Sequence, residues 1–217
     1  AFTEWGELRA YHGINSSGDV SDELSKKLIH GYRACISYID AQIGKIISSL
    51  EEEGILHETI IILWSDHGWK LGEYGDWCKH TNFELDVRVP VIITYEKLRK
   101  NIIIKDNIEL IDIFPTLSEM SGISIPDVDG KSLLPLMNGK DNSKRIALSQ
   151  YPRGGLMGYS IKIGQYRYTE WIDKKNITID YELFNHSNSD IADQNMYKSF
   201  NKDKKIILKK YIKIKIN

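Results

Sequence analysis

The chain has 217 residues, of which 41% are apolar and 27% charged, and its formal net charge is −1. These values are typical of one folded domain or of one and a half small ones, and they exclude the global basic field that favours nucleic acid. No apolar run approaches the roughly 20 residues needed to cross a bilayer, so we expect neither a nucleic-acid partner nor a membrane span.

The chain begins at Ala1 rather than Met, and we expect it to be part of a longer protein.

The first half of the sequence has one long helical pattern. Residues 21–54 have apolar residues at spacings of three and four, which predicts a single helix with one apolar face. Ser21, followed by two acidic residues, is the expected N-cap, and Gly54 stands where a glycine ends a helix.

Two short apolar runs follow the helix. Residues 59–64 and 87–95 are rich in β-branched side chains, which indicates strands buried on both faces, as in a parallel sheet. Pro90 makes the second strand irregular or places it near an edge. Residues 106–122 return to helical spacing, with Pro115 expected to kink or restart that helix. The order predicts an α/β layer in which helices cover a mostly parallel sheet.

The character of the sequence changes after Gly139. A polar linker (residues 140–144) precedes four short alternating segments at 146–151, 157–163, 166–171 and 179–184, and Gly164-Gln165 resembles a tight hairpin turn. We therefore predict two domains. Residues 1–140 would form the end of a larger α/β domain, and residues 141–217 a small antiparallel α+β subdomain.

The lysine-rich C-terminal tail and the two cysteines have ordinary structural interpretations. Seven lysines lie between residues 202 and 215, which favours a solvated helix or strand face, with contact to a polyanion or a membrane as the alternative. Cys35 falls in the helical pattern and Cys78 in a loop, and the sequence does not indicate a disulfide between them.

Residues 65–82 (SDHGWKLGEYGDWCKHTN) carry the chemistry. Asp66 and His67 come directly after a predicted buried strand, at the end of an α/β sheet where ligands bind. An oxygen ligand beside an imidazole suits a metal or oxyanion site, and Lys79 and His80 add cationic or titratable groups. From chemistry alone, a helix cap beside a hydrogen-bonded histidine explains the Asp-His pair as well.

The same segment matches the pattern S-D-H-G-W-x-L-G-E-x-G-x-W-x-K. Shorter motifs follow the same order along the chain: SYID at 37–40, VPVI at 89–92, DIFPTL at 112–117 and DGKSLL at 129–134. Together they resemble the sulfatases of the alkaline-phosphatase superfamily, most closely the iduronate-2-sulfatases and their bacterial relatives. The resemblance runs through nearly the whole chain and implies the C-terminal part of that fold.

The resemblance also implies roles for individual residues. Asp66 and His67 match two ligands of a divalent cation, most often Ca²⁺, that holds the sulfate group. Lys79 matches the lysine that contacts a sulfate oxygen, so it is the expected catalytic and substrate-binding residue. Trp69 and His80 are further candidates for substrate binding, although Trp69 and Trp77 also fit a packing role under the loop. The substrate would be a sulfated sugar of the glycosaminoglycan type.

Several departures from the family limit these expectations. The paired aspartates that complete the cation site are absent, and no C/S-x-P/A-x-R motif for a formylglycine nucleophile follows Cys35 or Cys78. We therefore expect the formylglycine in an N-terminal half, on the same or a separate chain, and no turnover by these residues alone. His67 replaces an oxygen ligand found in many sulfatases, which admits Mn²⁺ or Mg²⁺.

Two other classes of function fit the same residues. One is a phosphodiester or phosphonate hydrolase of the superfamily, and the other is a non-catalytic fragment that binds a glycan or a partner chain. A sulfatase of this type would be periplasmic, secreted or lysosomal.

Overall fold

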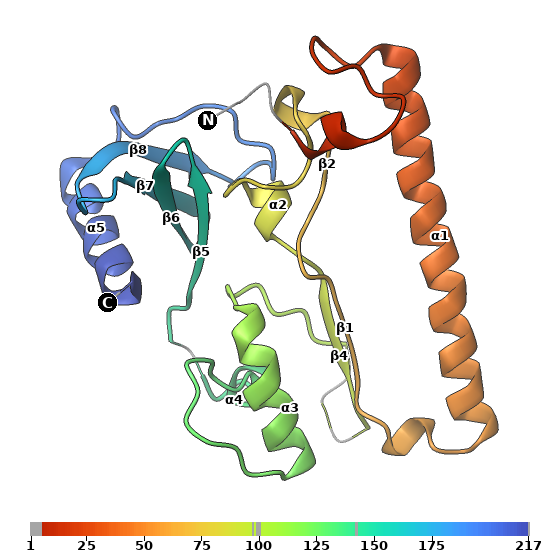
Figure 1. The fold of residues 1–217 in the computed structure, drawn as a ribbon. Coiled ribbons are helices and arrows are strands. Elements are labelled where there is room, and N and C mark those ends of the chain that lie inside the picture. Colours follow the sequence, from red (N-terminus) through yellow and green to blue (C-terminus); the bar gives the residue numbers. More distant parts are fainter. Residues whose placement is uncertain (1–5, 97, 99–100, 142, 217) are drawn as a thin grey trace. The chain divides into compact units, whose positions relative to one another are not determined.

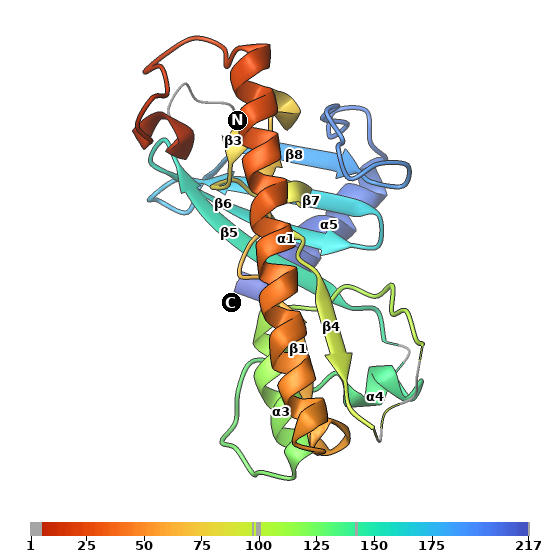
Figure 2. The same cartoon turned by 90° about the vertical axis from the view of Figure 1, so that its right-hand side faces the viewer.

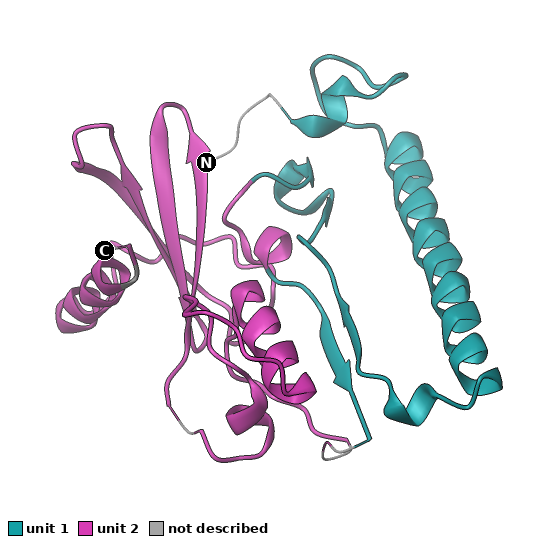
Figure 3. Cartoon of the chain, turned by 60° about the horizontal axis from the view of Figure 1, so that its bottom comes forward, with its two compact units in different colours: residues 1–80, 88–97 teal, residues 81–87, 98–217 magenta. Residues whose placement is uncertain are grey.

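The computed structural model describes residues 6–96, 98, 101–141 and 143–216. The chain forms two compact units, one of residues 1–80 with 88–97 and the other of residues 81–87 with 98–217 (Figure 3). The boundaries of these units differ from those of the predicted domains 1–140 and 141–217, which stay a prediction. Asn142 of the predicted linker lies outside the described residues.

The first unit is dominated by one long helix. Helix α1 (Asp22–Glu52) follows the short 3-10 helix η1 (Glu7–Ala10) and runs unbroken for 31 residues (Figure 2). The hydroxyl of Ser21 accepts a hydrogen bond from the Leu24 N–H at 3.3 Å, which confirms the predicted N-cap. Gly54 ends the helix with a left-handed φ of +70°, as the sequence predicts.

The apolar face of α1 is only partly covered. Leu28 and Ile29 pack against a small core of Leu8, Trp77 and Cys78. Farther along, Ile36 and Ile46 are more than half exposed, and no residue of α1 is buried. Most of the amphipathic face therefore lacks a covering element within the described residues.

The two apolar runs form a ribbon that differs from the prediction. After the short helix η2 (Leu56–Glu58), strand β1 (Ile61–Trp64) pairs with β4 (Val91–Thr94) in an antiparallel ladder that places Ile61 opposite Thr94. The expected parallel pairing with burial on both faces is wrong for these two strands, because Trp64 and Ile92 are at least half exposed. An apolar run predicts burial, but it does not specify the direction of the neighbouring strand. The strand β4 begins directly after Pro90, which cannot donate to a ladder.

The second unit contains the predicted antiparallel sheet. Strands β5 (Ile146–Arg153), β6 (Leu156–Ile163), β7 (Tyr166–Ile172) and β8 (Thr178–Asn185) lie side by side in chain order, all antiparallel (Figure 1). Gly164 has a φ of +54° at the first position of the β6–β7 turn, where a type II′ turn carries glycine. This confirms the predicted hairpin.

Helix α5 (Lys202–Ile216) covers the sheet through two buried residues. Leu208 and Ile212 pack against Ile161, Tyr168 and Leu183 of the sheet. The lysine-rich tail is therefore a helix that buries Leu208 and Ile212 and leaves three isoleucines (Ile206, Ile207 and Ile214) at least half exposed. Several of its lysines are exposed, as expected of a solvated helix face.

Three short helices complete the second unit. The four-residue helix α2 (Glu84–Val87) follows the candidate site segment, and α4 (Leu134–Met137) precedes the sheet. Between them, α3 (Ile113–Ser121) continues from the 3-10 turn η4 (Leu110–Asp112) with Pro115 in its first turn. The predicted helical range 106–122 is therefore too long at its start, and Pro115 lies in the first turn of α3, where its missing N–H is tolerated, instead of kinking or restarting a longer helix.

Candidate functional site

All five residues predicted to form the site lie in the first unit. Asp66 and His67 follow the last residue of β1, and Trp69 precedes a tight hairpin of β2 (Lys70–Leu71) and β3 (Trp77–Cys78). Lys79 and His80 come directly after the hairpin. The segment from Asp66 to His80 thus leaves β1 and reverses direction in the β2–β3 hairpin.

Buried contacts hold this hairpin together. The side chain of Lys70 is fully buried, and its Nζ lies 3.4 Å from Asp76 Oδ2. In the turn, which includes the 3-10 helix η3 (Glu73–Gly75), Gly72 has a φ of +110°. A Cβ atom on Gly72 would lie 3.3 Å from the Trp77 ring, so this glycine allows both the backbone conformation and the close packing of the indole. Trp77 is buried in the core, as the packing interpretation expected.

Asp66 and His67 place two potential metal ligands next to each other. His67 Nε2 lies 3.4 Å from Asp66 Oδ2. The other carboxylate oxygen, Oδ1, accepts hydrogen bonds from the His67 backbone N–H at 3.0 Å and from the Ser65 hydroxyl at 3.4 Å. These bonds orient the carboxylate so that Oδ2 faces the imidazole.

The imidazole of His67 is oriented by its other nitrogen. His67 Nδ1 lies 2.9 Å from the carbonyl oxygen of Gly68, which is the arrangement of an Nδ1–H donor. In that tautomer the lone pair is on Nε2, the atom nearest Asp66. Burial alone would raise the pKa of Asp66, but the charge of His67 when its ring is protonated and the hydrogen bonds to the carboxylate lower it, so the carboxylate is charged at neutral pH.

This donor pair fits part of a divalent cation site. Two adjacent ligands of one cation at about 2.3 Å are roughly 3.3 Å apart, close to the Asp66–His67 spacing. Asp66 is 83% exposed and His67 35%, so both donors are accessible. Within the part of the chain that the structure describes, no group of three or more His, Cys, Asp or Glu side chains gathers around a common point. Two donors alone do not complete the six to eight ligands that Ca²⁺ takes.

The ring of Trp69 is close to residues from both ends of the segment. Its ring centroid is 6.0 Å from that of His67 and 6.2 Å from that of Tyr32. Lys79 Nζ lies 4.9 Å from the Trp69 ring centroid, within the range of a cation–π interaction. The structure thus brings both His67 and Lys79 close to the Trp69 ring.

Lys79 is held by a carboxylate that the sequence did not indicate. Glu7 Oε1 lies 2.8 Å from Lys79 Nζ, Glu7 Oε2 lies 3.2 Å from His80 Nε2, and the Tyr11 hydroxyl donates to Oε1 at 2.9 Å. Glu7 is 72 residues away from Lys79 along the chain, within a segment that shows no motif. Only the fold reveals it as part of the site.

The ion pair between Glu7 and Lys79 shifts both pKa values. Burial alone would raise the pKa of Glu7, but hydrogen bonds from Lys79 and Tyr11 lower it. The hydrogen bond to Glu7 raises the pKa of Lys79. Burial raises the pKa of the neighbouring Cys78 thiol to about 11, so Cys78 is a protonated packing residue, and both cysteines are free.

The backbone around Lys79 is unusual for residues other than glycine. Cys78 has a φ of +65° and His80 a φ of +82°, so Lys79 lies between two left-handed residues. Such conformations persist only where surrounding contacts hold them, and they concentrate at functional sites. The contacts of Glu7 with Lys79 and His80 supply part of that restraint.

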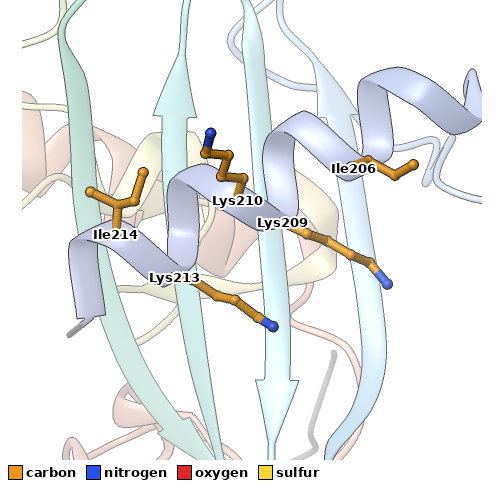
Figure 4. A pocket seen from close by; sticks show the side chains of 5 residues that line it. All are labelled: Ile206, Lys209, Lys210, Lys213 and Ile214. Carbon is orange, nitrogen blue, oxygen red and sulfur yellow. The ribbon is translucent and has the colours of Figure 1, made fainter.

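A surface hollow elsewhere contains none of the predicted site residues. It measures about 580 Å³ and is lined by Ile206, Lys209, Lys210, Lys213 and Ile214 of α5. Lys210 points away from Lys209 and Lys213 (Figure 4), so the three ammonium groups do not converge on one ligand position. Among the residues described, no helix is both long and apolar enough to cross a membrane.

Comparison with known proteins identifies two matching families. Residues 9–123 match the family described as Sulfatase, and residues 72–215 match the family described as N-sulphoglucosamine sulphohydrolase, C-terminal. The predicted site residues lie within the first match. Together the two matches extend over almost all of the chain.

Individual relatives agree with these families. The chain is 25% identical to iduronate 2-sulfatase of Mus musculus, covering 91% of this chain and 50% of that protein. It is 34% identical to a sulfatase of Formosa agariphila, over 68% of this chain and 29% of that one. The chain thus spans half the length, or less, of these relatives.

A solved structure shows the same fold. The phosphonate monoester hydrolase of Silicibacter pomeroyi superposes with a TM-score of 0.79 at 20% identity, covering 95% of this chain and 44% of that one. Likeness to this and other solved structures confirms the predicted fold class, the C-terminal part of an alkaline-phosphatase-like α/β fold with a small antiparallel subdomain.

Proposed function

This chain belongs to the sulfatase family, and we propose that the complete protein hydrolyses a sulfate ester on a glycosaminoglycan-type sugar. The observation that carries the proposal is the donor pair of Asp66 and His67, which follows β1 along the chain. There, the free oxygen of Asp66 and the Nε2 of His67 are 3.4 Å apart, with each side chain oriented by its own hydrogen bonds. The likeness to iduronate 2-sulfatase supports the class of substrate.

Asp66 and His67 would hold a divalent cation, for which we propose Ca²⁺. When bound, such a cation supplies Lewis-acid stabilisation of the charge that develops on the sulfate oxygens. Asp66 contributes a charged oxygen donor and His67 a nitrogen donor with a fixed tautomer. The formylglycine nucleophile and the remaining carboxylate ligands would come from the part of the protein outside these residues.

Lys79 is the proposed catalytic residue of this chain. Its ammonium group contacts a sulfate oxygen and stabilises negative charge in the transition state, as a fixed hydrogen-bond donor does at an oxyanion. A lysine has three N–H donors, so the bond to Glu7 leaves two for the substrate. Trp69 and His80 would border the bound sugar and its sulfate group.

The proposal also accounts for apolar surface that this chain leaves uncovered. Ile36 and Ile46 on α1 and Trp64 and Ile92 on the β1–β4 ribbon are at least half exposed. We propose that the N-terminal sulfatase half, on the same or a separate chain, packs on these faces. A periplasmic, secreted or lysosomal location remains part of the same proposal.

Kinetics of the complete protein on three aryl esters test the proposal. We expect an aryl sulfate to be hydrolysed faster than an aryl phosphate or an aryl phosphonate. Lys79→Ala should lower kcat by about 10²- to 10³-fold, the usual cost of losing one oxyanion donor. Lys27→Ala, which removes an exposed lysine paired with Glu23 at 2.7 Å, is the control and should leave the rate unchanged.

Other outcomes of these kinetics would support the alternatives. Faster hydrolysis of the phosphonate would favour the phosphodiester or phosphonate hydrolase. No hydrolysis of any ester, with retained binding of a sulfated glycan, would favour a non-catalytic role.

A further inference from the structure

Glu7 makes a set of contacts that the proposed mechanism does not use. Its two carboxylate oxygens are divided between the two cationic side chains at the end of the site segment: Oε1 faces Lys79 at 2.8 Å and Oε2 faces His80 at 3.2 Å. The Tyr11 hydroxyl also donates to Oε1, at 2.9 Å. One carboxylate on η1 thus fixes two neighbouring residues of the segment.

The burial of this pair distinguishes it from an ordinary surface ion pair. The side chains of Glu7 and Lys79 are 19% and 23% exposed, whereas those of Glu23 and Lys27 on α1 are 80% and 70% exposed at a similar distance. Exposed pairs are weakened by solvent and by side-chain entropy, and partly buried ones much less. We therefore expect the Glu7–Lys79 contact to persist in solution.

The geometry leaves Lys79 partly free. One side of its ammonium group is bonded to Glu7, and the ring of Trp69 lies 4.9 Å away. These two contacts fix the direction of the ammonium group without using all of its N–H donors. Cys78 and His80, on either side of Lys79, have strained left-handed backbone conformations. Without the contacts to Lys79, this strain would favour relaxation of the turn.

We propose that Glu7 is a positioning residue, which holds the His80 ring and orients the Lys79 ammonium group so that the remaining N–H groups of this lysine face an oxyanion. This inference rests on the proposed role of Lys79 at the sulfate group. Glu7 itself touches neither the substrate nor the donor pair of Asp66 and His67. Its effect on the reaction passes through Lys79 and His80.

The contact also favours the charged form of Lys79. The ionisable groups that face Lys79 are Glu7, Tyr11, Cys78 and His80. The hydrogen bond from Lys79 to Glu7 is the largest influence, and it raises the pKa of the lysine. Replacing the carboxylate with an amide should therefore let Lys79 lose its proton at a lower pH.

Chemical labelling of the complete protein tests the contact without relying on activity. An amine-reactive reagent is applied over a range of pH, and the modification of Lys79 is measured by peptide mass spectrometry. In Glu7→Gln, Lys79 should react faster and its labelling curve should move to lower pH. Glu23→Gln is the matched control and should leave Lys79 unchanged. Identical Lys79 curves in wild type and Glu7→Gln would overturn the proposal.

Kinetics then test the positioning role. In an active complete protein, Glu7→Gln should lower kcat/KM for an aryl sulfate by about 10- to 100-fold, as expected when a catalytic group is misplaced by about 1 Å. Glu7→Asp keeps the charge but shortens its reach, so it should fall between wild type and Glu7→Gln. It also serves as the second variant if the amide disturbs folding.

The two proposals fail in different ways. An active wild type in which Glu7→Gln changes neither the kinetics nor the labelling would overturn the role of Glu7 and leave the sulfatase function standing. An inactive wild type would overturn both.

Discussion

Glu84 is a buried carboxylate of the second unit that two cations share. Arg167 donates to its Oε2 through Nε at 2.9 Å and through a terminal nitrogen at 2.8 Å, and Lys162 Nζ lies 3.1 Å from Oε1. All three side chains are 11% exposed or less. Because Glu84 lies only four residues after His80, this cluster ties the segment that follows the site to the antiparallel sheet.

Removing the charge of Glu84 should destabilise the protein. Glu84→Gln leaves Arg167 and Lys162 buried without their counter-charge, and breaking such a pair costs about 3–5 kcal/mol. We expect a clearly lower urea midpoint for the complete protein. Glu23→Gln in the exposed pair on α1 is the control and should change stability by less than about 1 kcal/mol. Equal midpoints for the two variants would contradict this interpretation of the buried cluster.

The same group predicts a dependence of stability on pH. Burial alone would raise the pKa of Glu84, but the charges of Arg167 and Lys162 outweigh it and lower the pKa. A carboxylate with a lowered pKa in the folded state stabilises the protein above its unfolded pKa of about 4.3, and that stabilisation is lost as pH falls through the folded value. The difference in urea midpoint between wild type and Glu84→Gln should therefore shrink below about pH 4. A difference that stays constant down to pH 2 would contradict it.

At the scale of elements, two glycines have opposite environments. A Cβ atom on Gly130, in the loop between α3 and α4, would lie 2.0 Å from the carbonyl oxygen of Ile111, which is backbone and cannot move aside. On α1, a Cβ atom on Gly31 would meet nothing within 4 Å. The first glycine is required by a close approach of two segments, and the second only lowers helix propensity.

Alanine substitutions at these positions should therefore change stability in opposite directions. Gly130→Ala forces backbone segments apart, and overpacking of this kind costs about 1–3 kcal/mol. Gly31→Ala should stabilise α1 by about 0.5–1 kcal/mol, the usual difference between the two residues within a helix. Thermal unfolding of the two variants checks both signs, and a lower Tm for Gly31→Ala would show that its surroundings are not open.

The sequence predicted elements whose determinants are local. Ser21 and Gly54 marked the ends of α1, and alternation with Gly164 marked the antiparallel sheet, because caps and turns depend on neighbouring residues. The antiparallel pairing of β1 with β4 and the contact of Glu7 with Lys79 were missed. Both depend on segments that are distant along the chain, for which neither periodicity nor motif carries a signal.

At the scale of the whole molecule, we propose that the chain carries only part of a catalytic site, namely the donor pair of Asp66 and His67 and the lysine Lys79. The chain spans half the length, or less, of the curated relatives that it matches. We expect the 217-residue chain on its own to show no turnover of an aryl sulfate. Hydrolysis by this chain, purified from a host that lacks endogenous sulfatase, would contradict the proposed division of the site.

The exposed apolar faces predict a second property of the isolated chain. Because α1 and the β1–β4 ribbon leave large apolar side chains in solvent, the chain should bind a hydrophobic dye such as ANS more strongly than the complete protein does. Equal dye binding by the two would indicate that nothing covers these faces in the complete protein.

The metal content of the complete protein tests the central claim most directly. Elemental analysis after dialysis should find one divalent cation per protein in the wild type and a strongly reduced content in both Asp66→Asn and His67→Ala. His57→Ala serves as the control, because this exposed histidine also lies beside an acidic residue, with its Nε2 3.8 Å from Glu58. The His57→Ala variant should retain the cation. Equal metal content in all four proteins would contradict the assignment of Asp66 and His67 as its ligands.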